Sequence, residues 1–103
     1  MNFDDVETRR AKIISETAKI PWRELERFFA AGVVIGVAPG LDLVAVACAM
    51  ADDDKLQVEN WLSRGEIALV SDDQARGWLE AETVVWAVVT SPWVLAQPVA
   101  DVV

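Results

Sequence analysis

The chain has 103 residues, of which 53% are hydrophobic and 25% are charged, and its formal net charge is −8 with no His. This length suits one domain over residues 1–103 that buries about 65% of its unfolded surface, and the apolar fraction excludes a disordered acidic tail. The negative charge argues against a nucleic-acid partner, because binding to phosphates depends on Lys and Arg.

Two helices are predicted in the first third of the chain. Asp4 followed by Glu7 resembles a capping box, which predicts a charged amphipathic helix over residues 6–17. Pro21 suits the first position of a second helix, which Gly32 ends. The apolar face of this second helix comprises Trp22, Leu25, Phe28 and Phe29.

A buried strand over residues 33–37 comes next, because this segment is short, apolar and β-branched. Asp42 is placed to cap an apolar, buried helix over residues 43–51. The acidic run at residues 52–54 can cap a further helix, and a single long kinked helix over residues 43–63 stays open as the alternative.

The following segments predict a second strand and another helix. Residues 66–70 form the short strand, and Ser71 with Gln74 makes a capping box for a helix that ends near Ala81. Residues 83–90 give the strongest strand pattern. They are apolar on both faces, which is typical of a central strand in a covered sheet.

The C-terminal segment is predicted to end the sheet. Residues 91–92 (Ser-Pro) break or bulge the preceding strand, residues 93–95 continue it, and a flexible tail covers residues 98–103. The predicted order is α-α-β-α-α-β-α-β. This order indicates one compact α+β or α/β domain with a small sheet of about three strands packed under helices.

The predicted turn of Pro39, Gly40, Leu41 and Asp42 is the candidate ligand site. Helix-terminal amides attract phosphates, but this turn lacks a glycine-rich phosphate motif and Asp42 would repel an anion. A plain turn between strand and helix is the leading interpretation. A hydroxyl, an amine or a cation would suit the charge better than a phosphate.

No catalytic residue, metal ligand or cofactor site is recognised in the sequence. The usual serine relay cannot be built without His, and Cys48 has apolar neighbours typical of an inert buried thiol. The acids at residues 52–54 lack the spacing of a calcium loop. The seventeen Asp and Glu residues offer acid–base candidates that the sequence cannot rank.

Five tryptophans are many for this length. Trp22, Trp61 and Trp78 fall on the apolar faces of predicted helices, which favours core packing. Trp93 follows a bend near the end of the chain, where a large ring often meets a partner. The segment Trp93, Val94 and Leu95 is therefore the candidate interface.

Several segments together carry a resemblance to a known family. They are Glu16–Ile20, Trp22, Leu25, Phe28–Ala30, Val37–Val44, Asp53–Lys55, Trp61, Ser71–Asp72, Gln74–Ala75, Trp78, Trp86–Val89 and Pro92–Leu95. In combination they resemble a family of short bacterial proteins catalogued as a domain of unknown function, number 2288 of its series. The resemblance spans residues 16–97. It implies a small bacterial cytoplasmic protein and brings no activity, cofactor or catalytic residue with it.

The location is also indicated by the sequence itself. Cys48 has no second cysteine to pair with, and residues 1–5 are acidic, unlike a secretion signal. Pro39, Gly40 and Asp42 divide the apolar stretch 28–51 into pieces shorter than the roughly 20 residues that a membrane-spanning helix needs. We therefore expect a cytoplasmic protein without membrane contact.

The sequence favours a non-enzymatic protein-interaction module that self-associates as a homo-oligomer or docks on another protein. The high apolar fraction, the tryptophan-rich C-terminal half and the lack of recognised catalytic machinery support this hypothesis. Two alternatives stay open. One is a small-molecule pocket, enzymatic or not, near the turn at residues 39–42, and the other is an acidic protein that binds a basic partner surface.

Overall fold

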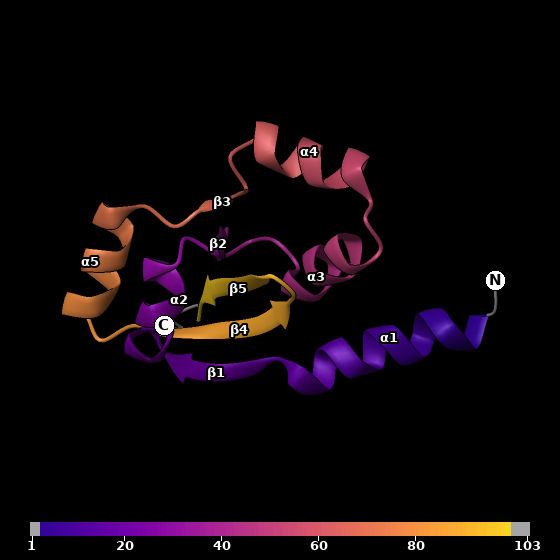
Figure 1. Cartoon of the computed structure of the whole chain (residues 1–103), viewed down its shortest axis with the longest axis horizontal. Coiled ribbons are helices and arrows are strands. Elements are labelled where there is room, and N and C mark those ends of the chain that lie inside the picture. The colour runs from indigo at the N-terminus through magenta and orange to yellow at the C-terminus, as the bar shows by residue number, and fades with distance from the viewer. Residues whose placement is uncertain (1–2, 100–103) are drawn as a thin grey trace.

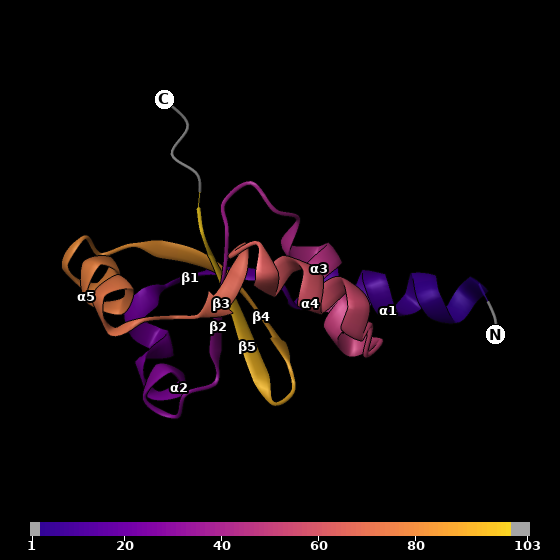
Figure 2. The ribbon, with the colours of Figure 1, turned by 90° about the horizontal axis from the view of Figure 1, so that it is seen from above.

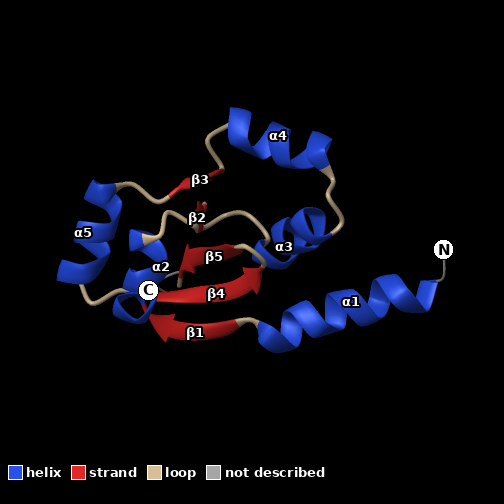
Figure 3. Ribbon diagram, in the orientation of Figure 1, coloured by secondary structure: helices blue, strands red, loops and turns tan. Residues whose placement is uncertain are grey.

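A computed structural model describes residues 3–99, which form five α-helices, one 3₁₀ turn and five strands (Figures 1 and 3). In chain order the elements are α1 (Phe3–Glu16), β1 (Ala18–Pro21), the 3₁₀ turn η1 (Trp22–Leu25), α2 (Glu26–Ala30), β2 (Val34–Val37), α3 (Leu43–Ala51), α4 (Lys55–Ser63), β3 (Ile67–Leu69), α5 (Asp72–Glu80), β4 (Val84–Thr90) and β5 (Trp93–Pro98). The α+β class is therefore confirmed.

The strands form one mixed sheet in the order β1-β4-β5-β2-β3. β5 and β2 are parallel, and the other neighbouring strands are antiparallel. The prediction of about three strands was wrong by two, because it omitted β1 and did not separate β5 from β4. β1 is short and contains Lys19 and Pro21, which weaken a strand pattern, and β5 folds back on β4 after Pro92.

Helices cover both faces of the sheet (Figure 2). Alternate strand residues point to opposite faces, so each face has its own core. The first core packs α1, α3 and α4 on the sheet through Ile13, Ile35, Val37, Leu43, Val46, Ala47, Ala49, Trp61, Ile67, Val88 and Leu95. The second core packs η1, α2 and α5 on the other face through Trp22, Leu25, Val34, Val70, Ala75, Val85, Ala87, Val94 and Ala96.

Three helices begin at the residues that the sequence marks as caps. The Asp42 and Asp54 carboxylates accept backbone N–H groups at the starts of α3 and α4, and the Ser71 hydroxyl accepts one at the start of α5. α3 and α4 are separate helices, so the alternative of one long kinked helix over residues 43–63 does not hold. Asp53 lies between them in the left-handed region, at φ 57°.

Three predicted boundaries need correction. α1 begins at Phe3, so Asp4 lies inside the helix and is not its cap. The predicted helix from Pro21 is divided into η1 and α2. Pro98, where the tail was expected to start, ends β5, and the Val99 amide donates to the Val84 carbonyl at 3.1 Å. Residues 100–103 of that tail lie outside the described residues.

Candidate functional site

The turn at residues 39–42 is held in place by a buried side chain from β5. The Gln97 amide nitrogen donates to the carbonyl oxygens of Ala38 (2.7 Å) and Leu41 (2.6 Å), and only 8% of Gln97 is exposed. No local sequence signal identified Gln97, because its partners lie more than fifty residues away. The turn therefore connects β2 to α3 and is fixed to β5 by hydrogen bonds.

The Asp42 carboxylate is also engaged in the fold. Its Oδ1 atom accepts from the amides of Val44 (3.0 Å) and Ala45 (3.2 Å). This geometry is that of a helix cap, and the cleft described below is lined by other residues. The turn residues Pro39, Gly40 and Leu41 bring no second charged group to Asp42 with which a ligand could be held.

Replacement of Asp42 by Ala is expected to lower the free energy of unfolding by about 1 kcal/mol, because two amides at the start of α3 lose their acceptor. Urea denaturation followed by circular dichroism measures this change. Asp42→Asn is the matched control, since Asn caps helices about as well as Asp. A loss of equal size in both variants would contradict the capping role.

The candidate interface segment is largely internal. Val94 packs in the core under α2 and α5, and Leu95 packs in the core under α3. Both side chains are buried within the chain, so Trp93 is the residue of this segment that has exposed surface. Trp93 remains partly exposed because it lies at the hairpin end of β5.

A cleft of about 540 Å³ opens beside Trp93. It is formed by the end of α3, the turn into α4, the first two turns of α4 and the tip of the β4–β5 hairpin. Its walls include Met50, Asp53, Asp54, Glu59, Pro92 and Trp93. In the sequence, the acids and the tryptophan of this cleft are separate features, and only the folded chain brings them together.

The carboxylates at this cleft are not neutralised by neighbouring side chains. Asp53, Asp54 and Glu59 are exposed and make no ion pair within the part of the chain that the structure describes. Lys55 is the one basic residue in the cleft wall. By contrast, Asp52 just outside the wall is paired with Arg9 of α1. The cleft therefore has a net negative charge.

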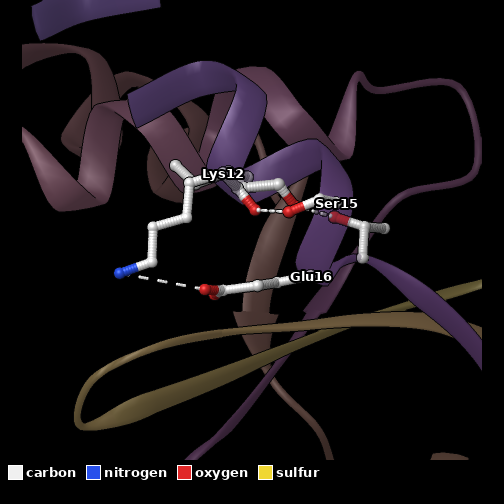
Figure 4. A network of polar contacts seen from close by, with 5 residues as sticks. Lys12, Ser15 and Glu16 are labelled. Carbon is white, nitrogen blue, oxygen red and sulfur yellow. Dashed lines mark hydrogen bonds and ion pairs between the residues drawn. The ribbon is translucent and has the colours of Figure 1, made fainter. Parts of the chain in front are cut away.

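The end of α1 carries a polar network that is satisfied within the chain (Figure 4). The Ser15 hydroxyl donates to the Lys12 carbonyl (2.8 Å), and the Lys12 ammonium lies 3.9 Å from a Glu16 carboxylate oxygen. The Thr17 hydroxyl donates to the Ile13 carbonyl (2.7 Å). Each contact spans three or four residues, so the network completes the helix end and leaves no converging groups for a ligand.

The β3 edge of the sheet is unpaired and apolar, and it is open to solvent at Leu69. The hydrogen bonds to β2 at Glu66 and Val70 show that the even-numbered residues of this segment face β2. The N–H and C=O groups of Ile67 and Leu69 therefore point away from the sheet. No described residue pairs with them. Leu69 is 58% exposed, so its N–H and C=O groups are open to solvent, whereas Ile67 is 1% exposed and its groups are covered.

The β1 edge, at the opposite side of the sheet, is protected. The hydrogen bond from the Trp22 amide to the Thr83 carbonyl shows that the even-numbered residues of β1 bond to β4. The backbone groups of Lys19 and Pro21 therefore face outward. Proline has no N–H to offer and lysine brings a charge, and both discourage the pairing of an edge strand. The two edges of one sheet thus differ in their capacity to bind a further strand.

Three further features concern the single cysteine, metal ligands and membrane-spanning helices. Cys48 is partly buried in α3 against the first core. Among the described residues, no group of three Cys, Asp or Glu side chains converges as a metal site. No described helix combines the length and the apolar character required to cross a membrane.

The fold and its surfaces define a small α+β domain in which a mixed five-stranded sheet lies between two layers of helices. The chain belongs to the DUF2288 family, described as a protein of unknown function, whose model matches residues 8–98. The resemblance found in the sequence is thus confirmed, and the match begins at residue 8 rather than at Glu16.

One solved structure shares this fold. The solution NMR structure of PA1075 from Pseudomonas aeruginosa is 47% identical in sequence, and the similarity covers 91% of this chain and 87% of that chain with a TM-score of 0.81. A comparison with curated proteins finds no match. Neither the family nor the similar structure assigns a function.

Proposed function

We propose that this protein is a non-enzymatic interaction module that self-associates by pairing the β3 edges of two copies. The observation that carries the proposal is the contrast between the open edge at β3 and the protected edge at β1. A sheet edge with unpaired N–H and C=O groups is a template for another strand, and natural proteins usually block it with charge or proline. β3, with the sequence Ile67-Ala68-Leu69, has neither.

Among the antiparallel registers that the alternation of hydrogen bonds allows, one uses both outward-facing residues of β3. In it, Ala68 of one copy lies opposite Ala68 of the other, and Ile67 lies opposite Leu69. Leu69 is exposed but Ile67 is 1% exposed, so the edge must open at Ile67 before the two Ile67–Leu69 pairs exchange their four hydrogen bonds and continue the sheet across the dimer. This arrangement is self-complementary, as a two-fold interface must be.

Charge complementarity supports the same antiparallel arrangement. Arg64 precedes β3 and Asp72 follows it, and both side chains are largely exposed. Pairing in this register brings Arg64 of one copy toward Asp72 of the other, where Asp72 would compete with Glu66, which lies 3.9 Å from Arg64 in the same copy. The attraction acts twice, once at each end of the interface, and it is reduced by salt.

The expected dimer is weak. Four hydrogen bonds at about 0.5–1.5 kcal/mol each do not offset an association cost of about 4–15 kcal/mol. Apolar contacts must add to them, and Leu62, which is 51% exposed at the end of α4 that leads into β3, can provide one. We therefore expect a dissociation constant on the order of 0.1 mM.

Sedimentation velocity from about 10 µM to about 1 mM tests the proposal, because the average mass should rise from 11.3 kDa toward that of a dimer. Leu69→Lys should remain monomeric over this range, since it places two like charges at the paired edges. Val89→Lys is the matched control, because Val89 is equally exposed (57%) on a strand away from this edge.

Two results would contradict the proposal: a wild-type protein that stays monomeric at 1 mM, or a Leu69→Lys variant that associates as strongly as the control. If the protein associates but the hydrogen-exchange rates of the β3 amides do not change, the pairing of β3 edges is contradicted.

We also propose a bacterial cytoplasmic location. The Pseudomonas aeruginosa source of the similar structure and the single cysteine of this chain support it. The alternative of a basic protein partner is less favoured, because ion pairs to Arg9, Arg23 and Arg76 interrupt the acidic surface.

A further inference from the structure

We propose that the cleft beside Trp93 binds a small organic cation, an amine that carries an apolar group. The ammonium group would lie among the carboxylates of Asp53, Asp54 and Glu59, and the apolar group would lie against Met50, Pro92 and Trp93. This inference is independent of self-association, because the cleft is formed by the α3–α4 turn and the β4–β5 hairpin and does not include β3.

The size and composition of the cleft suit a small molecule. Its volume of about 540 Å³ lies within the roughly 300–1,000 Å³ typical of ligand pockets. Its apolar wall is formed by side chains from two separate segments, the end of α3 and the hairpin tip. Its polar wall is formed by the turn and the start of α4, so a ligand with one apolar and one polar end would contact both.

The charge of the cleft selects for cations. Three carboxylates outnumber Lys55, and none of them has an ion-pair partner among the described residues. The C-terminal end of α3 also faces this region, and the partial negative charge of a helix C-terminus favours cations.

An anion is disfavoured at the same place, although the α4 N-terminus is part of the wall. The Asp54 carboxylate already accepts from the Gln57 amide (3.3 Å), so it occupies the donor that an anion would use. Its charge would also repel a phosphate or a carboxylate.

One feature of the hairpin side favours an amine over a simple metal cation. Trp93 is partly exposed and lines the cleft, and Trp is the strongest side chain for cation–π contact.

Titration of the ¹⁵N-labelled protein with benzylamine, benzyl alcohol and benzoate tests this inference. The three probes share one ring and differ in charge. Benzylamine is expected to shift the Trp93 indole N–H, the amides of residues 50–59 and those of Thr90, Ser91 and Trp93 in a saturable way. The affinity for benzyl alcohol should be lower than that for benzylamine by a factor of about five or more, and benzoate should not bind there. Added salt should weaken the benzylamine shifts.

A double variant, Asp53→Asn with Glu59→Gln, removes two charges from the cleft wall without removing the side chains. Asn is also tolerated at the left-handed position of Asp53. Benzylamine affinity should fall about fivefold or more. The matched control is Glu26→Gln with Glu80→Gln, which removes the same charge from exposed positions outside the cleft.

The inference is overturned if benzyl alcohol or benzoate binds as well as benzylamine, if the benzylamine shifts lie outside the cleft, or if both double variants lose affinity equally. Repeating the titration with the Leu69→Lys variant separates the two proposals, because amine binding should be unchanged in a protein that does not self-associate.

Discussion

Trp22→Ala is expected to lower the free energy of unfolding by about 3–5 kcal/mol, the range for removal of a large buried aromatic side chain. Trp22 is 1% exposed, and its ring makes edge contacts with Trp78 (4.9 Å between centroids) and Phe29 (5.9 Å). These contacts join η1, α2 and α5 over one face of the sheet. Each kcal/mol corresponds to about 4–8 °C in Tm for a domain of this size.

This loss is large compared with the whole stability of a small domain, which is commonly about 5–15 kcal/mol. Urea unfolding followed by far-ultraviolet circular dichroism measures it, and Trp22→Phe is the control because it keeps an aromatic ring in the same space. The Phe variant should lose less than half as much. A cost below about 1 kcal/mol for Trp22→Ala would mean that the α2 and α5 layer does not unfold together with the sheet.

The helix starts were predictable because their signals are local. Asp42 and Ser71 each lie within three residues of the amides that they cap, so the sequence contains the whole interaction. β2 was also recognised, since a short apolar and β-branched run suits a covered strand. These elements depend on neighbours in sequence more than on the rest of the fold.

The missed strands depend on distant partners. Ala18–Pro21 contains a charge and a proline, and it becomes a strand because Ala87 and Val85 of β4 pair with it. The parallel pairing of β2 with β5 joins Val34 to Val94, so no local pattern reveals it. The same limit applies to the surfaces, because the cleft and the open edge arise only when separate segments meet.

The turn at residues 39–42 combines a feature encoded by neighbouring residues with one that depends on a distant residue. Its position and its cap were correctly expected from the sequence, whereas the anchor that fixes it was not. Gln97 lies between the predicted strand continuation at residues 93–95 and the predicted tail at residues 98–103, and its amide group donates to the carbonyls of Ala38 and Leu41. A polar residue among buried strand residues is the one signal that could have indicated such a role.

Gln97→Met is expected to lower the free energy of unfolding by about 1–3 kcal/mol. Met keeps much of the side-chain volume but cannot donate a hydrogen bond. The Leu41 carbonyl then loses the donor that the structure gives it, while the Ala38 carbonyl keeps the Leu41 amide at 3.0 Å. Urea denaturation measures the loss, and a change near zero would show that water replaces the amide without cost.

Gln97→Glu should add a dependence on pH that the wild-type protein lacks at this position. An ionised carboxylate facing two carbonyl oxygens is disfavoured, while a neutral carboxyl can donate to one of them, so the pKa of the introduced group is raised in the folded state. The unfolded chain ionises near the ordinary Glu pKa of about 4.3. The variant therefore loses stability relative to wild type as pH rises above about 4.3, and the loss levels off above the folded-state pKa.

Urea unfolding at several values between about pH 4 and pH 7 gives this difference directly. Gln57→Glu is the matched control, because Gln57 is exposed in the first turn of α4, where a carboxylate is tolerated. The stability difference between Gln97→Glu and wild type should widen with rising pH, while that of the control should not. A constant difference would show that the introduced carboxyl does not face the Ala38 and Leu41 carbonyls, and the turn would then need another anchor.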